Sequence, residues 1–160
     1  MFLRALIAFL ALPGVVAGLI PALLVSVDAG RRDGWVFGFV FVGIGFVLLL
    51  WCVRDFFKAG RGTLAPWDPP KYLVVVGLYR FVRNPMYVAV VTLVAGWSLV
   101  AGSRLLVWYG VLLAVGFHLR VIFYEEAWLR HQFGEEWTRY SASVSRWLPR
   151  ISPWKYDKGN

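Results

Sequence analysis

Residues 77–87 read Gly77-Leu78-Tyr79-Arg80-Phe81-Val82-Arg83-Asn84-Pro85-Met86-Tyr87, and this stretch decides how the chain can fold. It is polar, basic and aromatic, and apolar segments lie on both sides of it. Proline biases the preceding residue away from helix and suits the first turn of a helix, so Asn84-Pro85 predicts a helix that begins at Pro85. We therefore expect an ordered entry into a membrane helix, with these side chains at the boundary between water and lipid.

The composition is that of a membrane protein. Of the 160 residues, 59% are hydrophobic and the mean hydropathy is +0.63, whereas soluble domains contain about 45–50% apolar residues. The formal net charge is +8, but the basic residues flank apolar segments, which indicates anchoring to anionic lipid headgroups rather than binding of nucleic acid. Cys52 is the only cysteine, which excludes a disulfide framework and a cysteine-based zinc site.

Four apolar runs predict an all-α integral membrane protein with about four transmembrane helices. The runs cover residues 2–27, 35–53, 86–101 and 105–124, and about 20 apolar residues span the hydrocarbon core. Residues 1–160 then form a single domain: residues 1–53 supply two N-terminal transmembrane helices, and residues 54–160 supply a polar loop, a helical hairpin and a tail. Close helix contacts are expected at Gly14, Gly18, Gly34, Gly38, Gly43 and Gly45.

The last two runs predict an antiparallel hairpin with a tight turn at Gly102-Ser103. The fourth helix should continue beyond the membrane to Phe133 as a cytoplasmic helical extension, until Gly134 interrupts it. A further amphipathic piece has a pattern typical of a helix that lies on lipid headgroups. Its apolar residues are Trp137, Tyr140, Val144 and Trp147.

Charge predicts the orientation. The 54–84 loop and the tail after Tyr124 are the basic segments, and four spans place both on the same side. The positive-inside rule makes that side cytoplasmic. We therefore expect a multi-pass protein of a bacterial inner membrane, with its active site facing the cytoplasm.

An acidic pair, Glu125-Glu126, ends the fourth run of a chain that is otherwise basic. His118 lies close to two helical turns before Glu125 and shares its face, while Glu126 and Arg130 form an i, i+4 pair of favourable order. Ionisable groups at membrane depth are costly and are candidates for function. Three plainer interpretations stay open: the acids mark where the helix leaves the lipid, Tyr79 and Tyr87 belong to an interfacial aromatic belt, and His118 is simply packed and hydrogen-bonded.

No metal site is predicted. The only histidines, His118 and His131, lie on different helix faces, and the chain has no motif of a soluble nucleotide-binding fold.

Three stretches together resemble the isoprenylcysteine carboxyl methyltransferase family, which is related to the integral-membrane phospholipid N-methyltransferases. They are residues 77–87, Glu125-Glu126, and the run Phe133-Gly134-Glu135-Glu136-Trp137-Thr138-Arg139-Tyr140. The resemblance covers roughly residues 60–150. It implies S-adenosylmethionine as methyl donor, bound at the cytoplasmic ends of the last two helices. The residues implied to hold the donor are Lys71, Tyr72, Leu73, Val74, Gly77, Tyr79, Arg83, Asn84, Pro85, Met86, Tyr87, Glu125 and Glu126.

The chemistry suits that donor, because a carboxylate can hold the ammonium group of its methionine moiety and aromatic faces attract a sulfonium cation. Two departures bear on the acceptor. Asn84 and Lys71 stand where the family often has histidine, and asparagine cannot carry a proton. Val121 stands where prenylcysteine enzymes have an arginine for the substrate carboxylate. The adjacent Arg120 is therefore the candidate substrate-binding residue, and a prenylcysteine-like acceptor is disfavoured.

We expect in-line methyl transfer to a lipid-like or membrane-embedded acceptor, with positioning and exclusion of water supplying much of the catalysis. The expected acceptor class is an aminophospholipid headgroup or another lipid-like amine or carboxylate. Because an amine must be neutral when it attacks, Glu125, Glu126 and His118 are candidate proton acceptors. The alternatives are an NADPH-dependent enzyme similar to membrane sterol reductases and a non-catalytic membrane scaffold, and titration with both cofactors discriminates among the three.

Overall fold

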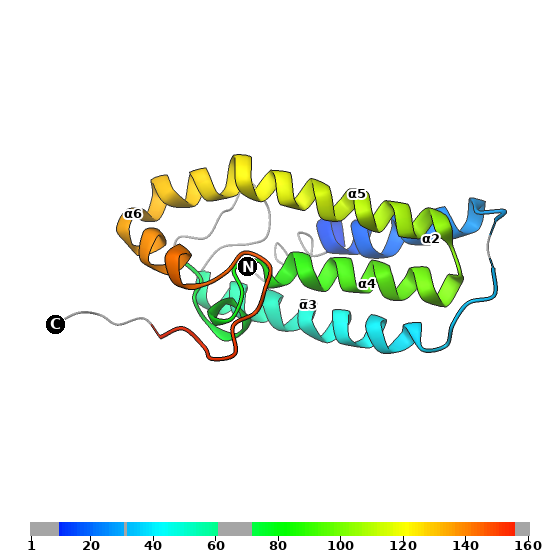
Figure 1. Ribbon diagram of the computed structural model, residues 1–160, viewed down its shortest axis with the longest axis horizontal. Helices are drawn as coiled ribbons and strands as arrows, with labels where there is room; N and C mark the ends of the chain where they lie inside the picture. The colour runs from blue at the N-terminus through cyan, green and yellow to red at the C-terminus, as the bar shows by residue number, and fades with distance from the viewer. Residues whose placement is uncertain (1–9, 31, 61–71, 156–160) are drawn as a thin grey trace.

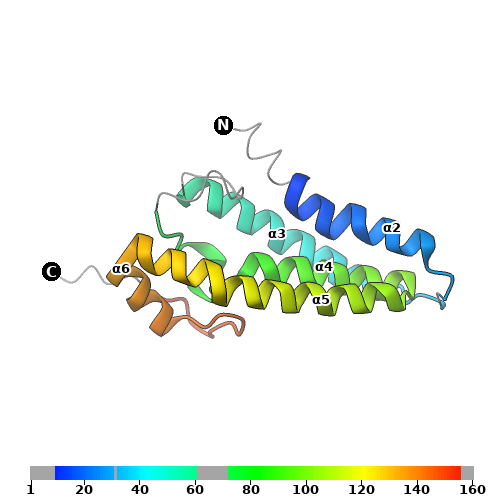
Figure 2. The same ribbon diagram turned by 90° about the horizontal axis from the view of Figure 1, so that it is seen from above.

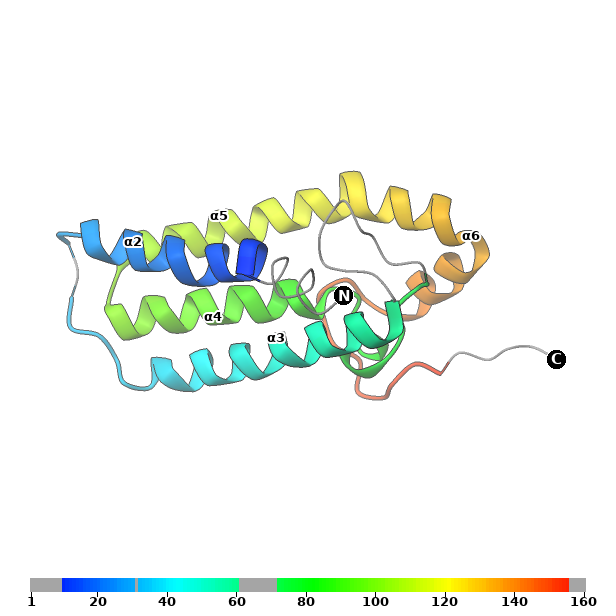
Figure 3. The same cartoon turned by 180° about the vertical axis from the view of Figure 1, so that it is seen from behind.

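The computed structural model describes residues 10–30, 32–60 and 72–155. Every regular element in these ranges is helical, which confirms the all-α prediction. The elements are η1 (Leu10–Leu19), α2 (Ile20–Val27), α3 (Gly38–Gly60), η2 (Gly77–Arg80), α4 (Pro85–Ala101), α5 (Arg104–Arg120), η3 (Val121–Glu125) and α6 (Glu126–Ser143). The long helices form an elongated bundle in which α4 lies between α3 and α5 (Figure 1, Figure 3).

Helices α3 and α4 pack closely because glycines bring their backbones together. A Cβ atom on Gly38 would lie 2.8 Å from the carbonyl oxygen of Gly96, and one on Gly45 would lie 2.8 Å from the amide nitrogen of Leu93. The predicted close contacts are confirmed at Gly34, Gly38 and Gly45. They are wrong at Gly18 and Gly43, where an added Cβ atom would meet nothing within 4 Å. Between the helices lies an apolar core that includes Leu49, Ala89, Val90, Leu93 and Val94.

The predicted hairpin turn is confirmed. Gly102 ends α4 with a left-handed φ of 59°, a conformation that suits glycine because it has no Cβ atom. Ser103 then caps α5, since its Oγ accepts a hydrogen bond from the amide of Leu106 at 3.3 Å. The same hydroxyl donates to Asp28 at 2.5 Å, which ties the end of α2 to the hairpin.

Among the described residues, two helices are long and apolar enough to cross a membrane: Gly38–Asp55 within α3, and the continuous helix Arg104–Ser143. Pro13–Val27 and Pro85–Ala101 are apolar but shorter. At a rise of about 1.5 Å per residue, the second long helix is about twice as long as the hydrocarbon core is thick, so part of it lies outside the membrane. The exact count of four spans stays a prediction.

The long helix bends back at its far end (Figure 2). Gly134 has φ 49° and ψ −118°, which confirms the predicted interruption. The prediction that the following piece lies on headgroups is wrong, because Trp137, Tyr140 and Val144 are buried. They pack against Leu73, Val75 and Trp154. These three side chains are therefore surrounded by other parts of the protein, including the 72–84 segment, and not by lipid headgroups.

Candidate active site

The 77–87 segment is held between the membrane bundle and the C-terminal tail. The hydroxyl of Tyr140 donates to the carbonyl of Tyr79 at 2.6 Å, and the amide of Arg83 donates to the carbonyl of Ser145 at 2.9 Å. Asn84 donates from Nδ2 to the carbonyl of Arg146 at 3.2 Å. Helix α4 then begins at Pro85, as predicted. These bonds fix the segment that carries most of the sequence-predicted site residues.

Gly77 brings this segment onto α3. Its φ of 52° is left-handed, and a Cβ atom there would lie 1.8 Å from Oδ2 of Asp55. Neighbouring Val74 and Tyr79 are buried against Cys52. Tyr72 is exposed, whereas Leu73 packs against the Trp137 cluster. Lys71 lies outside the described residues.

Tyr87, at the start of α4, meets Glu125, at the end of η3. The Tyr87 hydroxyl donates to Oε1 of Glu125, and Nε of Arg120 donates to the same oxygen at 2.7 Å. The ring of Phe117 stacks on Tyr87 with a centroid distance of 4.2 Å. Residues 121–125 form the π-helical turn η3, which places the i, i+5 pair Arg120 and Glu125 side by side. Groups that lie 38 residues apart in the chain therefore converge.

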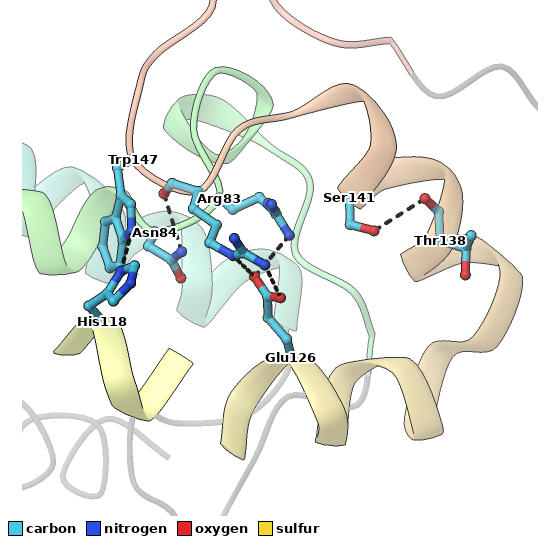
Figure 4. Close-up of polar contacts among 8 residues, drawn as sticks. Arg83, Asn84, His118, Glu126, Thr138, Ser141 and Trp147 are labelled. Carbon is cyan, nitrogen blue, oxygen red and sulfur yellow. Dashed lines mark hydrogen bonds and ion pairs between the residues drawn. The ribbon is translucent and has the colours of Figure 1, made fainter. Parts of the chain in front are cut away.

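Glu126 has a different environment, which Figure 4 shows. Its Oε1 accepts from Nη1 of Arg83 at 3.0 Å and from Nε of Arg146 at 2.6 Å, and its Oε2 accepts from Nη2 of Arg146 at 2.9 Å. Burial favours the neutral acid, but the Arg146 hydrogen bonds and the Arg83 charge outweigh it, so the pKa of Glu126 lies below its ordinary value. This ion-pair cluster joins α6, the 77–84 segment and the tail.

His118 pairs with the tail and not with the acids. The indole Nε1 of Trp147 donates to Nδ1 of His118 at 3.1 Å (Figure 4). An indole nitrogen can only donate, so Nδ1 holds a lone pair and the proton of the neutral ring lies on Nε2. We predict that His118 and Glu125 share a helix face, but in the described part of the chain their side chains form no hydrogen bond or ion pair with each other. The π-helical turn η3 lies between them and changes the direction in which Glu125 points relative to His118. Glu126 forms its ion pairs with Arg83 and Arg146, whereas Arg130 acts on it through its charge.

Sequence reasoning missed Arg146, and it named Trp147 only as an apolar residue of the amphipathic piece. The sequence carries only a weak signal for their roles: a basic–aromatic pair shortly after Trp137, Tyr140 and Val144, which are buried. Their partners lie 20 and 29 residues away, at Glu126 and His118.

Comparison with known proteins decides the family. Residues 34–136 match the phospholipid methyltransferase family, which is more than half of the chain. The chain belongs to this family. No curated protein and no solved structure matches it.

The match to the phospholipid methyltransferase family bears on the candidate site and on the predicted resemblance. It covers both sides of the Tyr87–Glu125 contact, and it confirms the resemblance to integral-membrane methyltransferases that the sequence indicated. It favours methyl transfer to membrane lipids over the reductase alternative. Arg146 and Trp147, in contrast, lie beyond the last matched residue, 136.

Proposed function

We propose that the protein transfers a methyl group from S-adenosylmethionine to a lipid-like acceptor at the cytoplasmic surface of the membrane. The observation that carries this proposal is the contact between Tyr87 and Glu125, within the part of the chain that matches a methyltransferase family. Two segments that the resemblance assigns to the methyl donor meet at that contact.

The charged and aromatic side chains around Glu125 suit the amino-acid end of S-adenosylmethionine, which carries an ammonium and a carboxylate group. The described residues use only Oε1 of Glu125, and the side chain is 25% exposed, so Oε2 is open to an ammonium group. The side chain of Arg120 is 48% exposed, and its guanidinium has further N–H groups for a carboxylate. The stacked rings of Tyr87 and Phe117 offer aromatic faces to a sulfonium. When bound, S-adenosylmethionine supplies an electrophilic methyl group.

The two acids then take different roles. Glu125 orients the donor, because its open oxygen can hold the ammonium group. Glu126 positions Arg83 and Arg146, since among the described residues its side chain forms ion pairs with these two guanidinium groups. His118 acts as a hydrogen-bond donor through Nε2 and not as a base, because Trp147 occupies its lone pair at Nδ1. Buried Val74 and Tyr79 keep water from the segment beside the donor.

Transfer of labelled methyl groups tests this proposal. Purified protein in neutral micelles is incubated with methyl-labelled S-adenosylmethionine and a bacterial lipid extract, and label in the lipid fraction is counted. We expect incorporation by the wild type and a drop of about tenfold or more for Glu125→Gln, which weakens a charge-assisted hydrogen bond. Glu135→Gln is the matched control, because Glu135 is an exposed acid on the same helix.

Two results would count against the proposal. Equal incorporation by Glu125→Gln and the wild type would remove Glu125 from the site. Absence of incorporation by the folded wild type would contradict the proposed activity.

A further inference from the structure

A hollow opens beside the ion-pair cluster, on the side of the tail. Its volume is about 370 Å³, and it is lined by Arg83, His118 and residues 141–148. Most of these lining residues lie beyond the last position of the family match, 136.

The walls of the hollow are positively charged. In its lining, Arg83 and Arg146 carry two charges against the single charge of Glu126. Arg150 lies outside the lining, and its guanidinium donates to the carbonyl of Ser143, which lines the hollow, at 2.8 Å. The Nε group of Arg83 is buried and has no hydrogen-bond acceptor. Each guanidinium has five N–H groups, so the contacts with Glu126 leave donors available on both arginines. A site with surplus fixed positive charge favours an anion.

Neutral donors surround these charges. The amide groups of residues 145–148 donate no hydrogen bond to any other described residue. Ser143 and Ser145 contribute exposed hydroxyl groups, and His118 presents the Nε2 proton that its bond with Trp147 dictates. Arginine forks, hydroxyls and main-chain amides together are the groups that bind phosphate oxygens in proteins.

The hollow lies near the end of the fourth apolar run of the sequence. His118, which lines it, is in the last turn of α5, shortly before that run ends at Tyr124. Leu148 in its lining is 76% exposed, and Ile151 further along the tail is fully exposed, as expected of apolar side chains that enter the headgroup region. These features favour a position at the depth of lipid phosphates. Two chain neighbours link the hollow to the Tyr87–Glu125 contact: His118 lines the hollow, and the ring of Phe117 stacks on Tyr87.

We propose that this hollow binds the phosphodiester of the acceptor lipid and presents the headgroup to the site at Glu125. The inference rests on the proposed function and extends it, since it places recognition of the lipid phosphate at Arg83 and at tail residues beyond the family match. An amine two carbons from that phosphodiester, as in an aminoethyl headgroup, then reaches toward Tyr87 and Glu125 while the phosphate stays with the arginines. The tail beyond the matched region supplies substrate recognition.

Calorimetric titration of the protein in phosphate-free maltoside micelles, without S-adenosylmethionine, tests the assignment. The test pair is Ser145→Glu and Ser145→Gln, which are similar in size and differ in charge; the Ser145 side chain has no hydrogen-bond partner among the described residues, so both variants should fold. The probes are a soluble short-chain phosphatidylethanolamine, octylamine and inorganic phosphate. Lys155→Gln, which removes a positive charge from an exposed position in the same tail, is the charge control.

We expect Ser145→Glu to bind the short phosphatidylethanolamine about tenfold or more weakly than Ser145→Gln, because the new carboxylate repels the phosphate. Octylamine should bind both variants equally, and Lys155→Gln should bind the lipid like the wild type. Equal binding of the lipid by the two Ser145 variants would overturn the proposal. Inorganic phosphate that binds as tightly as the lipid would also overturn it, since the hollow would then be a site for the free anion.

The readout separates this proposal from the activity itself. Charge-dependent lipid binding without any methyl transfer would support the hollow as a phosphodiester site and contradict the proposed function. If the protein transfers methyl groups but Ser145→Glu and Ser145→Gln bind the lipid with equal affinity, the result would support the proposed function and contradict the assignment of the hollow as the phosphodiester site.

Discussion

At the scale of single residues, the adjacent acids Glu125 and Glu126 differ in what holds them. Glu125 shares one oxygen between Tyr87 and Arg120 and keeps the other open. Glu126 is 8% exposed and is held by two arginines. A carboxylate with an open oxygen can bind a ligand, whereas one that is fully engaged by arginines stabilises the fold. Substitution should therefore affect binding at Glu125 and stability at Glu126.

Glu126→Gln should lower the free energy of unfolding by about 3 kcal/mol at neutral pH, because it leaves the largely buried Arg83 without a counter-charge. The folded-state pKa of Glu126 is below the ordinary value of 4.5. Its stabilising contribution is therefore complete above about pH 4.5 and is lost as the pH falls through the folded pKa. Denaturant unfolding in micelles should show a gap between wild type and variant that narrows at acid pH.

Glu135→Gln serves as the control here as well, since Glu135 is exposed on the same helix. A gap that stays constant down to pH 2 would show that the charge of Glu126 is not what stabilises the fold.

At the scale of elements, the bend in α6 positions the tail. Gly134 takes φ 49° and ψ −118°, and an added Cβ atom would meet nothing within 4 Å. The need for glycine there is one of backbone conformation and not of space. Beyond the bend, Trp137 and Tyr140 are buried, and Arg146 and Trp147 reach Glu126 and His118.

Gly134→Ala should lower the free energy of unfolding by about 1–3 kcal/mol, because an L-residue is strained in this conformation. Gly116→Ala is the matched control: Gly116 lies in the same continuous helix, also with nothing within 4 Å of an added Cβ atom. That substitution should raise the free energy by up to about 1 kcal/mol through helix propensity. The same loss for both substitutions would contradict a special role for the bend.

The sequence predicted those elements whose cause is local. Pro85 begins α4, Gly102 ends it, and Gly134 bends α6, because proline and glycine act through their own backbone. It failed for contacts between distant segments. Tyr140 could not be assigned to lipid or to protein from its spacing alone, since both are apolar surroundings. The partners of Glu126 depend on the fold of the tail, which carries no local signal.

At the scale of the whole molecule, the hairpin turn and the candidate site lie at opposite ends of the bundle (Figure 1). At one end, the hydrogen bond between Ser103 and Asp28 joins α2 to the hairpin turn. At the other end, the ion pairs of Glu126 join α6 to the tail. The positive-inside rule predicts that the second end faces the cytoplasm, because the basic tail belongs to it.

Cysteine labelling tests this orientation. Cys52 is completely buried, so it should not react in the wild type. In intact cells, a membrane-impermeant maleimide should label Ala29→Cys, which is exposed at the end of α2, and should label Lys155→Cys only after lysis. The reverse pattern would place the candidate site outside the cytoplasm.

The central claim is that the end of the bundle where Tyr87 meets Glu125 binds the methyl donor. Equilibrium binding of S-adenosylmethionine to the protein in micelles, with NADPH titrated in parallel, measures it most directly. We predict that the wild type and Glu135→Gln bind S-adenosylmethionine equally, that Glu125→Gln binds it about tenfold or more weakly, and that NADPH does not bind. Binding of NADPH without S-adenosylmethionine, or unchanged affinity in Glu125→Gln, would contradict the claim.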